Sequence, residues 1–238
     1  MTKHILYITI LCLFNLTFTT AQQGNVSDPA NSQTIQGWSN RYLQDPYIKR
    51  ILGKANEMPK PEEIKGSPYS NKKFLTAQIF INNKQVDEEF LRYNAFSDEM
   101  EIPYNDDYLS IIKSPNQKII LDGTTYICLK DNSGKLKYFI DHGTFNNFQL
   151  LERYKVIFKN GIKAKTSLER EIPPSFKSRY SYYLLNLTTD NVYLLNNANR
   201  KKFNNSLQVI SPKLAKKSKK LKLRGKELNE IKSLLKSV

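Results

Sequence analysis

Residues 118–129 read KIILDGTTYICL, two apolar runs separated by Asp122-Gly123. An Asp-Gly pair between such runs is a strong signal of a two-residue β-hairpin, because both turn residues tolerate a positive φ angle. This stretch therefore predicts two antiparallel strands, and the sequence on either side of it follows the same pattern.

Similar runs recur from Phe74 to Leu195. Their apolar residues alternate with a period close to two, and turn residues such as Asn82-Asn83 separate them. The other runs predicted as strands are 74–81, 90–95, 99–102, 108–112, 136–140, 150–158, 182–187 and 192–195. No helical crossover lies between them, so neighbouring strands must pair antiparallel. We therefore expect an α+β protein, mainly antiparallel β, whose sheet curls into a sandwich or half-barrel.

The first 21 residues have the pattern of a cleavable signal peptide. A mostly apolar run from Ile5 to Phe18 follows a short basic start, and small residues precede a cut after Ala21. The run of about 14 residues is shorter than the ~20 that a membrane-spanning helix needs. We expect an exported protein, periplasmic or extracellular, with no transmembrane span after cleavage.

Residues 22–65 are predicted to form a polar leader with one short helix and a proline linker. Asp45-Pro46 is typical of a helix start, with Ile51 and Leu52 on the apolar face of that helix. Met58-Pro59-Lys60-Pro61 predicts an extended linker, because each proline disfavours helix for the residue before it.

The β domain predicted over residues 66–199 is followed by a basic tail, residues 200–238. The tail has thirteen Lys and Arg against two Glu, a net +11 out of +15 for the whole chain. Two short helices are predicted, one over the Lys-rich residues 212–220 and one over 228–238, where apolar residues have the spacing of an amphipathic helix. Six residues are candidates for contact with an anionic surface, as opposed to an ordinary solvated helix face: Lys216, Lys217, Lys219, Lys220, Lys222 and Arg224.

Residues suited to catalysis or metal binding are scarce. After removal of the signal peptide, Cys128 and His142 are the only cysteine and histidine. A zinc site needs three or four such ligands, so we expect neither a metal nor a cofactor. Cys128 lies in an apolar strand and is expected to be a buried small hydrophobe, although a dyad with His142 is conceivable.

Five acidic residues between positions 98 and 107 are a candidate calcium site. Its carboxylates could supply oxygen ligands to calcium. However, Glu99 and Glu101 alternate with Met100 and Ile102, which favours a solvated strand face followed by a turn. The members of the cluster are Asp98, Glu99, Glu101, Asp106 and Asp107.

Seven stretches between Gly66 and the last helix form a recognisable set: Gly66-Ser67-Pro68-Tyr69, Leu91-Arg92-Tyr93-Asn94-Ala95, Asp98-Glu99-Met100-Glu101, Asp122-Gly123-Thr124-Thr125-Tyr126-Ile127, Leu150-Leu151-Glu152-Arg153-Tyr154, Tyr182-Tyr183 and Lys220-Leu221-Lys222-Leu223. In this order they resemble a family of uncharacterised secreted proteins of Bacteroidetes-type bacteria. The resemblance covers Gly66 to Val238, and this chain departs from it in the tail, where the first helix is shorter and richer in lysine. It implies a Gram-negative envelope or extracellular setting and transfers no activity.

These observations predict a non-enzymatic binding or structural protein whose basic tail contacts an anionic envelope lipid or glycan. Nucleic acid is not the expected partner, because the basic run has no interleaved aromatic residues for base stacking. The alternative is a secreted hydrolase with paired carboxylates on the sheet, since such pairs leave no local signature in a sequence.

Overall fold

The structure is a computed structural model that describes residues 50–52, 64–105, 107–131, 133–164, 166 and 169–237. The predicted signal peptide, the proline linker and most of the leader lie outside the described residues. The exceptions are Arg50–Leu52 and the short segment that begins at Ile64.

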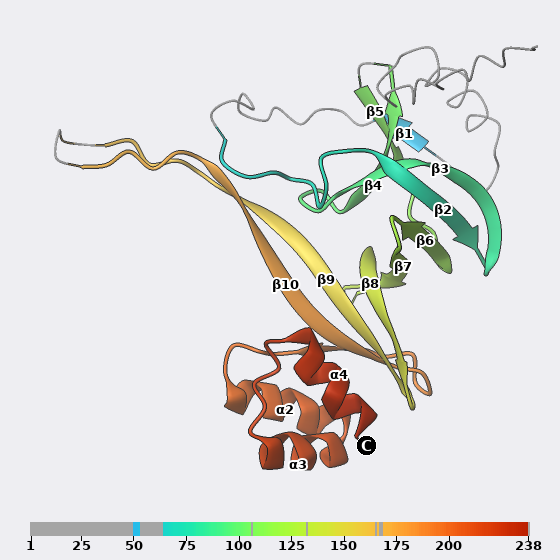
Figure 1. Ribbon diagram of the computed structural model, residues 1–238, viewed down its shortest axis with the longest axis vertical. Coiled ribbons are helices and arrows are strands. Elements are labelled where there is room, and N and C mark those ends of the chain that lie inside the picture. The colour runs from blue at the N-terminus through green and yellow to red at the C-terminus, as the bar shows by residue number, and fades with distance from the viewer. Residues whose placement is uncertain are drawn as a thin grey trace, which may run out of the picture.

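The described strands form one large open sheet, and the predicted antiparallel class is confirmed. Strands follow each other across the sheet in the order β1-β5-β4-β3-β2-β6-β7-β8-β9-β10-β11, and every neighbouring pair is antiparallel (Figure 1). The strands are β1 (Arg50–Leu52), β2 (Leu75–Ile81), β3 (Lys84–Asn94), β4 (Glu99–Tyr104), β5 (Asp107–Ile111), β6 (Gln117–Leu121), β7 (Thr124–Lys130), β8 (Leu136–Phe145), β9 (Phe148–Lys159), β10 (Ser175–Asn186) and β11 (Val192–Leu195).

The two hairpin turns expected from the sequence are present. Asn82 and Asn83 have φ angles of 51° and 64° between β2 and β3, and Asp122 and Gly123 have 47° and 75° between β6 and β7. Asn, Asp and Gly are the residues that adopt such angles at low cost, which is why these positions turn the chain.

The predicted helix after Asp45-Pro46 is wrong where the structure describes it. Arg50–Leu52 is strand β1 and pairs with β5, with Ile51 opposite Ser110. A helix of about eight residues is marginal in isolation, whereas the edge of β5 offers backbone hydrogen bonds to an extended segment. Residues 45–49 lie outside the described residues.

Strands β9 and β10 pair along their full length of 12 residues, and both contribute side chains to each of three apolar cores. The smallest core contains Leu151 and Leu185. One half contributes Val156 and Phe176 to the core enclosed by β2–β8. The other half contributes Leu150 and Leu184 to a core under the helices. Figure 1 shows this long pair running from the upper strands down to the helices.

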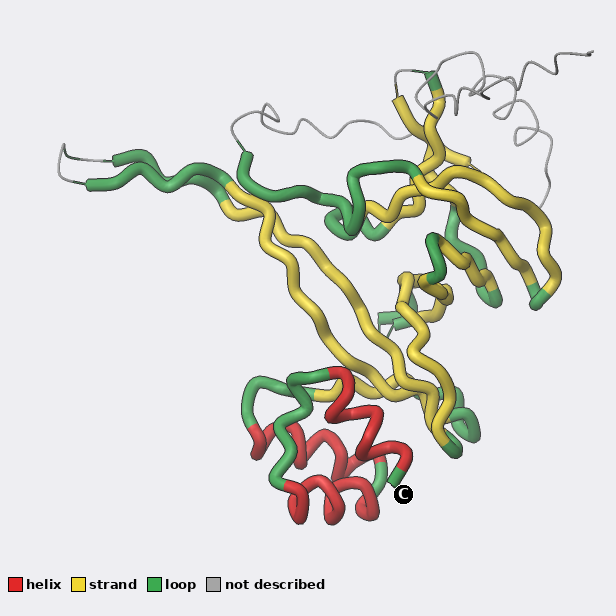
Figure 2. Tube along the Cα trace, in the orientation of Figure 1, coloured by secondary structure: helices red, strands yellow, loops and turns green. Residues whose placement is uncertain are grey.

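The basic tail forms three helices, α2 (Arg200–Ile210), α3 (Pro212–Leu221) and α4 (Leu228–Lys236), all at one end of the molecule (Figure 2). The sequence predicted only the last two. The Asn199 side chain caps α2, and Phe203 and Leu207 are its buried stripe. This capping residue and the i, i+4 spacing were the available signals.

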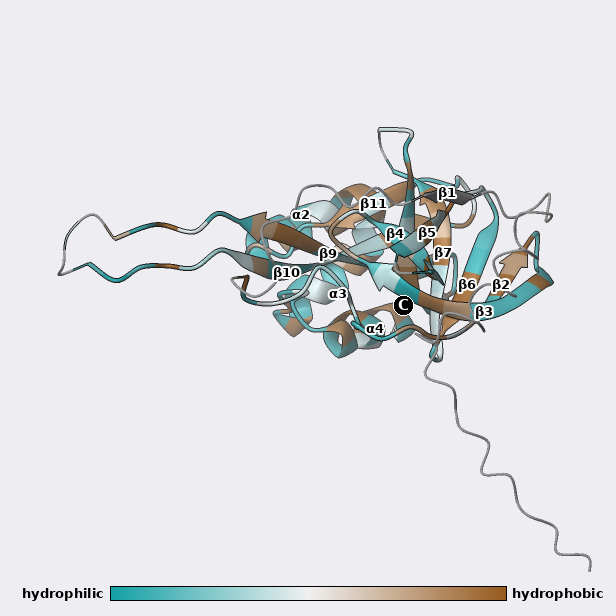
Figure 3. Cartoon of the chain, turned by 90° about the horizontal axis from the view of Figure 1, so that it is seen from above, coloured by the Kyte–Doolittle hydropathy of each residue, from teal (hydrophilic) through white to brown (hydrophobic). Residues whose placement is uncertain are grey.

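Beyond the paired ends of β9 and β10, the segments that follow β9 and precede β10 continue side by side as an arm that projects from the body (Figure 3). Ile162 and Ile172 exchange backbone hydrogen bonds of 2.7 and 2.9 Å in this arm, and their side chains are exposed. Most of the arm is hydrophilic in Figure 3, so these isoleucines are isolated apolar positions.

Candidate functional site

The six cationic residues predicted to contact an anionic surface lie on α3 and on the loop after it. Four belong to α3, Lys222 is its C-cap in the left-handed region, and Arg224 follows in the loop. All are exposed except Lys217, which is half-buried. The four on α3 are Lys216, Lys217, Lys219 and Lys220.

Packing on the opposite side of α3 directs these cations outward. Leu214, Ala215 and Ser218 are buried against the other helices and the sheet. On a helix with 3.6 residues per turn, Lys216, Lys219 and other intervening residues then face the solvent. The spacing of apolar and basic residues along α3 therefore places the lysines on the solvent-facing side of the helix.

Local capping orders the loop that carries Arg224. Glu230 of α4 accepts hydrogen bonds from the backbone N–H of Arg224 at 2.6 Å and of Lys226 at 3.2 Å. Gly225 has a φ angle of +66° and lies against the Phe203 ring, where a side chain would overlap that ring. The loop is thus held by both a carboxylate and the helical core.

None of the six cations forms an ion pair within the part of the chain that the structure describes. Ion pairs among the described residues are centred on Glu101, Asp98 and Glu152, in the strands of the sheet and the turns that connect them. The charges of these six side chains therefore attract solvent counter-ions, which are released when a polyanion binds.

A second cationic site lies where the β8–β9 ladder ends. The ladder runs from Phe145 opposite Phe148 only as far as Ile140 opposite Glu152. Beyond it the turn between β3 and β4 inserts between the two strands. The backbone N–H of Val156 on β9 donates to the Ala95 carbonyl at 2.9 Å, and that of Tyr138 on β8 donates to Asp98 Oδ1 at 3.3 Å. The Asp98 carboxylate thus accepts the hydrogen bond that the backbone of Tyr138 would otherwise donate to a neighbouring strand.

Asp98 is buried at the centre of this arrangement and is surrounded by donors. Its Oδ1 also accepts a hydrogen bond of 2.8 Å from the Tyr93 hydroxyl. Its Oδ2 lies 3.2 Å from Lys113 Nζ and 3.7 Å from Lys137 Nζ. Burial, followed by the Asp98 charge, raises the pKa of Tyr93 well above its usual range, so this phenol stays protonated and donates.

A cavity of about 110 Å³ opens beside the inserted turn. Three of its charged lining residues are cations and the fourth is Asp98. The lining residues come from three separate stretches of sequence, so no local motif predicts the site. The residues that line it are Tyr93, Ala95, Phe96, Ser97, Asp98, Lys137, Arg153, Tyr154 and Lys155.

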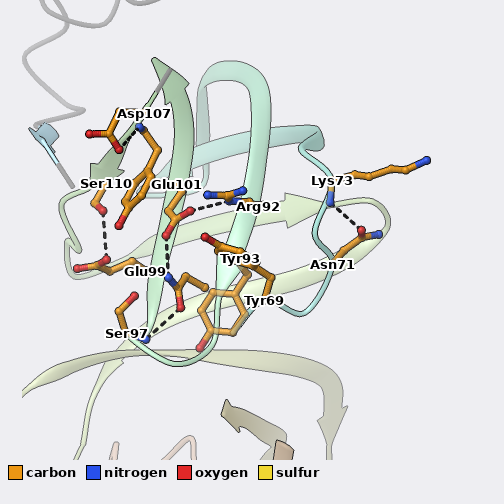
Figure 4. Close-up of polar contacts among 12 residues, drawn as sticks. Tyr69, Asn71, Lys73, Arg92, Tyr93, Ser97, Glu99, Glu101, Asp107 and Ser110 are labelled. Atoms are coloured by element: carbon orange, nitrogen blue, oxygen red, sulfur yellow. Dashed lines mark hydrogen bonds and ion pairs between the residues drawn. The ribbon is translucent and has the colours of Figure 1, made fainter. Parts of the chain in front are cut away.

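The solvated strand face expected for Glu99 and Glu101 is wrong for Glu101. Its side chain is 0% exposed, and it lies opposite Arg92 across β3 and β4. Arg92 Nε donates to Glu101 Oε2 at 2.6 Å, and Asn94 Nδ2 donates to Oε1 at 2.8 Å (Figure 4). A cross-strand arginine explains how a carboxylate can be accommodated inside the sheet.

Aromatic rings complete the surroundings of Arg92. Its guanidinium carbon lies 3.9 Å from the centre of the Tyr69 ring and 4.5 Å from that of Phe74. Burial raises the pKa of Glu101, and the neighbouring Arg92 charge acts in the opposite direction. Glu99 lies apart from this pair and accepts a hydrogen bond of 3.3 Å from the Ser110 hydroxyl.

The two residues considered for nucleophilic chemistry have other contacts. Cys128 is buried in the core, as predicted, and burial raises the pKa of its thiol to about 12. His142 Nε2 lies 2.8 Å from Glu152 Oε2, a partner that no local motif revealed. A thiol with so high a pKa is protonated at neutral pH and is a poor nucleophile.

The acidic cluster is not gathered into a metal site in the described residues. Asp98 and Glu101 face cations, Asp106 lies outside the described residues, and no group of three or more His, Cys, Asp or Glu is placed to hold a metal ion there. Among the described helices, none has the length and apolar character to span a bilayer.

Comparisons of the chain with family models, with curated proteins and with solved structures gave no match.

Proposed function

We propose that this is an exported, non-enzymatic binding or structural protein of the cell envelope, and that its three-helix unit contacts an anionic lipid or glycan. The observation that carries the proposal is the set of solvent-facing cations without ion pairs on α3 and its loop. Its exported location rests on the signal-peptide pattern of residues 1–21.

Charge density supports an extended polyanion as the partner. Each Lys or Arg near an anionic membrane surface contributes ~1 kcal/mol, and the attraction falls off within a Debye length of about 8–10 Å at physiological salt. Such attraction needs no shaped pocket, which suits an exposed helix face lined with lysine side chains. The sheet, which we take to be a half-barrel in its upper part, would serve as the scaffold.

The hydrolase alternative has less support. Glu101 is a buried carboxyl group with a raised pKa, but Arg92 and Asn94 occupy both of its oxygens. The cavity beside the inserted turn has Asp98 as its only carboxylate lining residue. Two carboxylates facing one cavity, which glycoside hydrolysis requires, are therefore not brought together there.

Vesicle co-sedimentation of the mature chain tests the proposal. Vesicles with an anionic phospholipid or lipopolysaccharide should bind it, and neutral phosphatidylcholine vesicles should not. The triple substitution of Lys216, Lys219 and Lys220 by Gln should weaken binding by about 100-fold, from ~1 kcal/mol per charge. Deleting the helices is a poorer test, because the deletion would also uncover Leu150 and Leu184 of the sheet.

The matched control is the triple substitution of Lys72, Lys84 and Lys163 by Gln, which removes the same charge from exposed positions outside the helices. If both triple variants lose affinity equally, only net charge matters and the helical unit has no special role. Binding that is insensitive to salt would also count against the proposal. Cell fractionation and an intact mass matching Gln22 to Val238 test the exported location.

A further inference from the structure

The cavity at the end of the β8–β9 ladder has an excess of positive charge that the fold does not use. Lys137, Arg153 and Lys155 line it, and Asp98 is the only acidic lining residue. Lys113 lies outside the lining and approaches Asp98 Oδ2 at 3.2 Å, closer than the 3.7 Å of Lys137. Lys113 and Lys137 thus share the neutralisation of Asp98, and the charged lining residues Lys137, Arg153, Lys155 and Asp98 together keep a net charge of +2.

A neutral donor without a partner is present at the same place. The Ser97 hydroxyl is buried and has no hydrogen-bond partner among the described residues, although Ser97 lines the cavity. The backbone N–H of Ser97 is already used, because it donates to Asn94 Oδ1 at 3.1 Å. A buried hydroxyl without a partner is costly, and a bound acceptor would satisfy it.

The size of the cavity restricts the ligand. A volume of about 110 Å³ corresponds to roughly three or four water molecules at ~30 Å³ each. A tetrahedral oxyanion with four oxygens around one central atom has that size. A phosphate monoester carries about −1.5 to −2 charges near neutral pH, which matches the cationic excess better than a single carboxylate does.

We propose that this cavity binds a phosphate group, with Arg153, Lys155 and Lys137 as the charged donors and Ser97 as the neutral donor. Arg153 offers a planar fork of N–H groups and Lys155 lies two residues further along β9, so both point from the same side of that strand. The phosphate group is that of inorganic phosphate or of a phosphate monoester. This site is independent of the helical unit and does not rest on its proposed function.

Isothermal titration calorimetry of the mature chain with inorganic phosphate tests the site at an ionic strength of ~0.1 M, where the Debye length is ~10 Å. The wild type should give a saturable signal with one site per chain, and acetate should bind at least roughly tenfold more weakly. The double substitution R153Q/K155Q should weaken phosphate binding by roughly tenfold or more, and S97A by a few-fold. Glycerol phosphate replaces phosphate in a second series, and tighter binding of the ester would identify a phosphate monoester as the ligand.

The control K163Q/R170Q removes the same charge from exposed positions on the arm and should leave the affinity within about twofold, because surface charges beyond a Debye length are screened. Far-ultraviolet circular dichroism establishes that each variant is folded. No saturable phosphate signal in the wild type would overturn the proposal, and so would equal losses in R153Q/K155Q and the control. The Lys216, Lys219 and Lys220 triple variant should keep its phosphate affinity, which separates this result from that of the vesicle experiment.

Discussion

Replacing Arg92 with Met should destabilise the protein strongly, and in a way that depends on pH. Among the described residues, Arg92 is the only cation paired with Glu101; Arg92 Nε lies 2.6 Å from Glu101 Oε2, and the Glu101 side chain is 0% exposed. Removing one partner of a buried ion pair costs about 3–5 kcal/mol, because the remaining charge is left without compensation. For a chain of this size, that corresponds to a fall in Tm of about 6–20 °C at roughly 2–4 °C per kcal/mol.

The pH dependence follows from the pKa of Glu101. Burial already raises this pKa above its usual value of 4.5, and Arg92 is the largest influence that lowers it. Without Arg92 the folded-state pKa rises further, so the ionised carboxylate becomes the unfavourable form in the folded protein. The free energy of unfolding of R92M should therefore increase as the pH falls through the folded-state pKa, and level off below the unfolded value.

Urea unfolding between pH 4 and pH 8 measures this effect. The double variant R92M/E101Q is the control, because Gln keeps an acceptor for Asn94 and removes the charge. It should recover most of the lost stability and show little of the pH dependence. If R92M and R92M/E101Q are equally unstable at every pH, the loss comes from packing against Tyr69 and Phe74, and the unpaired-charge argument is refuted.

Three other substitutions or reactions test separate parts of the structure. D98N should cost about 2–4 kcal/mol, since two lysines lose their buried counter-charge; an unchanged urea midpoint would contradict the role of Asp98. G225A should lower the free energy of unfolding by about 2 kcal/mol or more, because residue 225 has a positive φ and the added Cβ would overlap the Phe203 ring. A Tm equal to that of the wild type would contradict this expectation. Cys128, with a pKa raised to about 12, should react with a thiol reagent at pH 8 only after denaturation, and rapid labelling of the native chain would show that the thiol is accessible.

Local chemistry made the strands predictable. Turns such as Asn82-Asn83 and Asp122-Gly123 act through their own backbone preferences, and period-two alternation marks the face of each strand. Helix α2 was missed because its apolar stripe consists of few residues among polar ones, so that tertiary packing of Phe203 decides its conformation. The segment at Ile51 was assigned to the wrong state because the edge of β5, distant in sequence, decides it.

The two cationic sites likewise differ in whether residues close in sequence or residues distant in sequence form them. The basic residues of α3 lie close together in the sequence, so composition and helical period suffice to find them. The cavity requires Asp98, Lys137 and Arg153 to meet, and they meet because a ladder ends and a turn enters the gap. Glu101 illustrates the same limit, since alternation placed it on one face of β4 but could not show that Arg92 and aromatic rings cover that face.

The shared strands β9 and β10 have a consequence for how the molecule unfolds. Each contributes side chains to both of the larger apolar cores and to the smaller third one, so none of these cores can unfold while leaving the others with their full set of neighbours. Heat or denaturant should therefore produce a single cooperative transition rather than two. We therefore expect that the net charge changes sharply near residue 199, whereas the cooperative folding unit continues past this residue to the last helix.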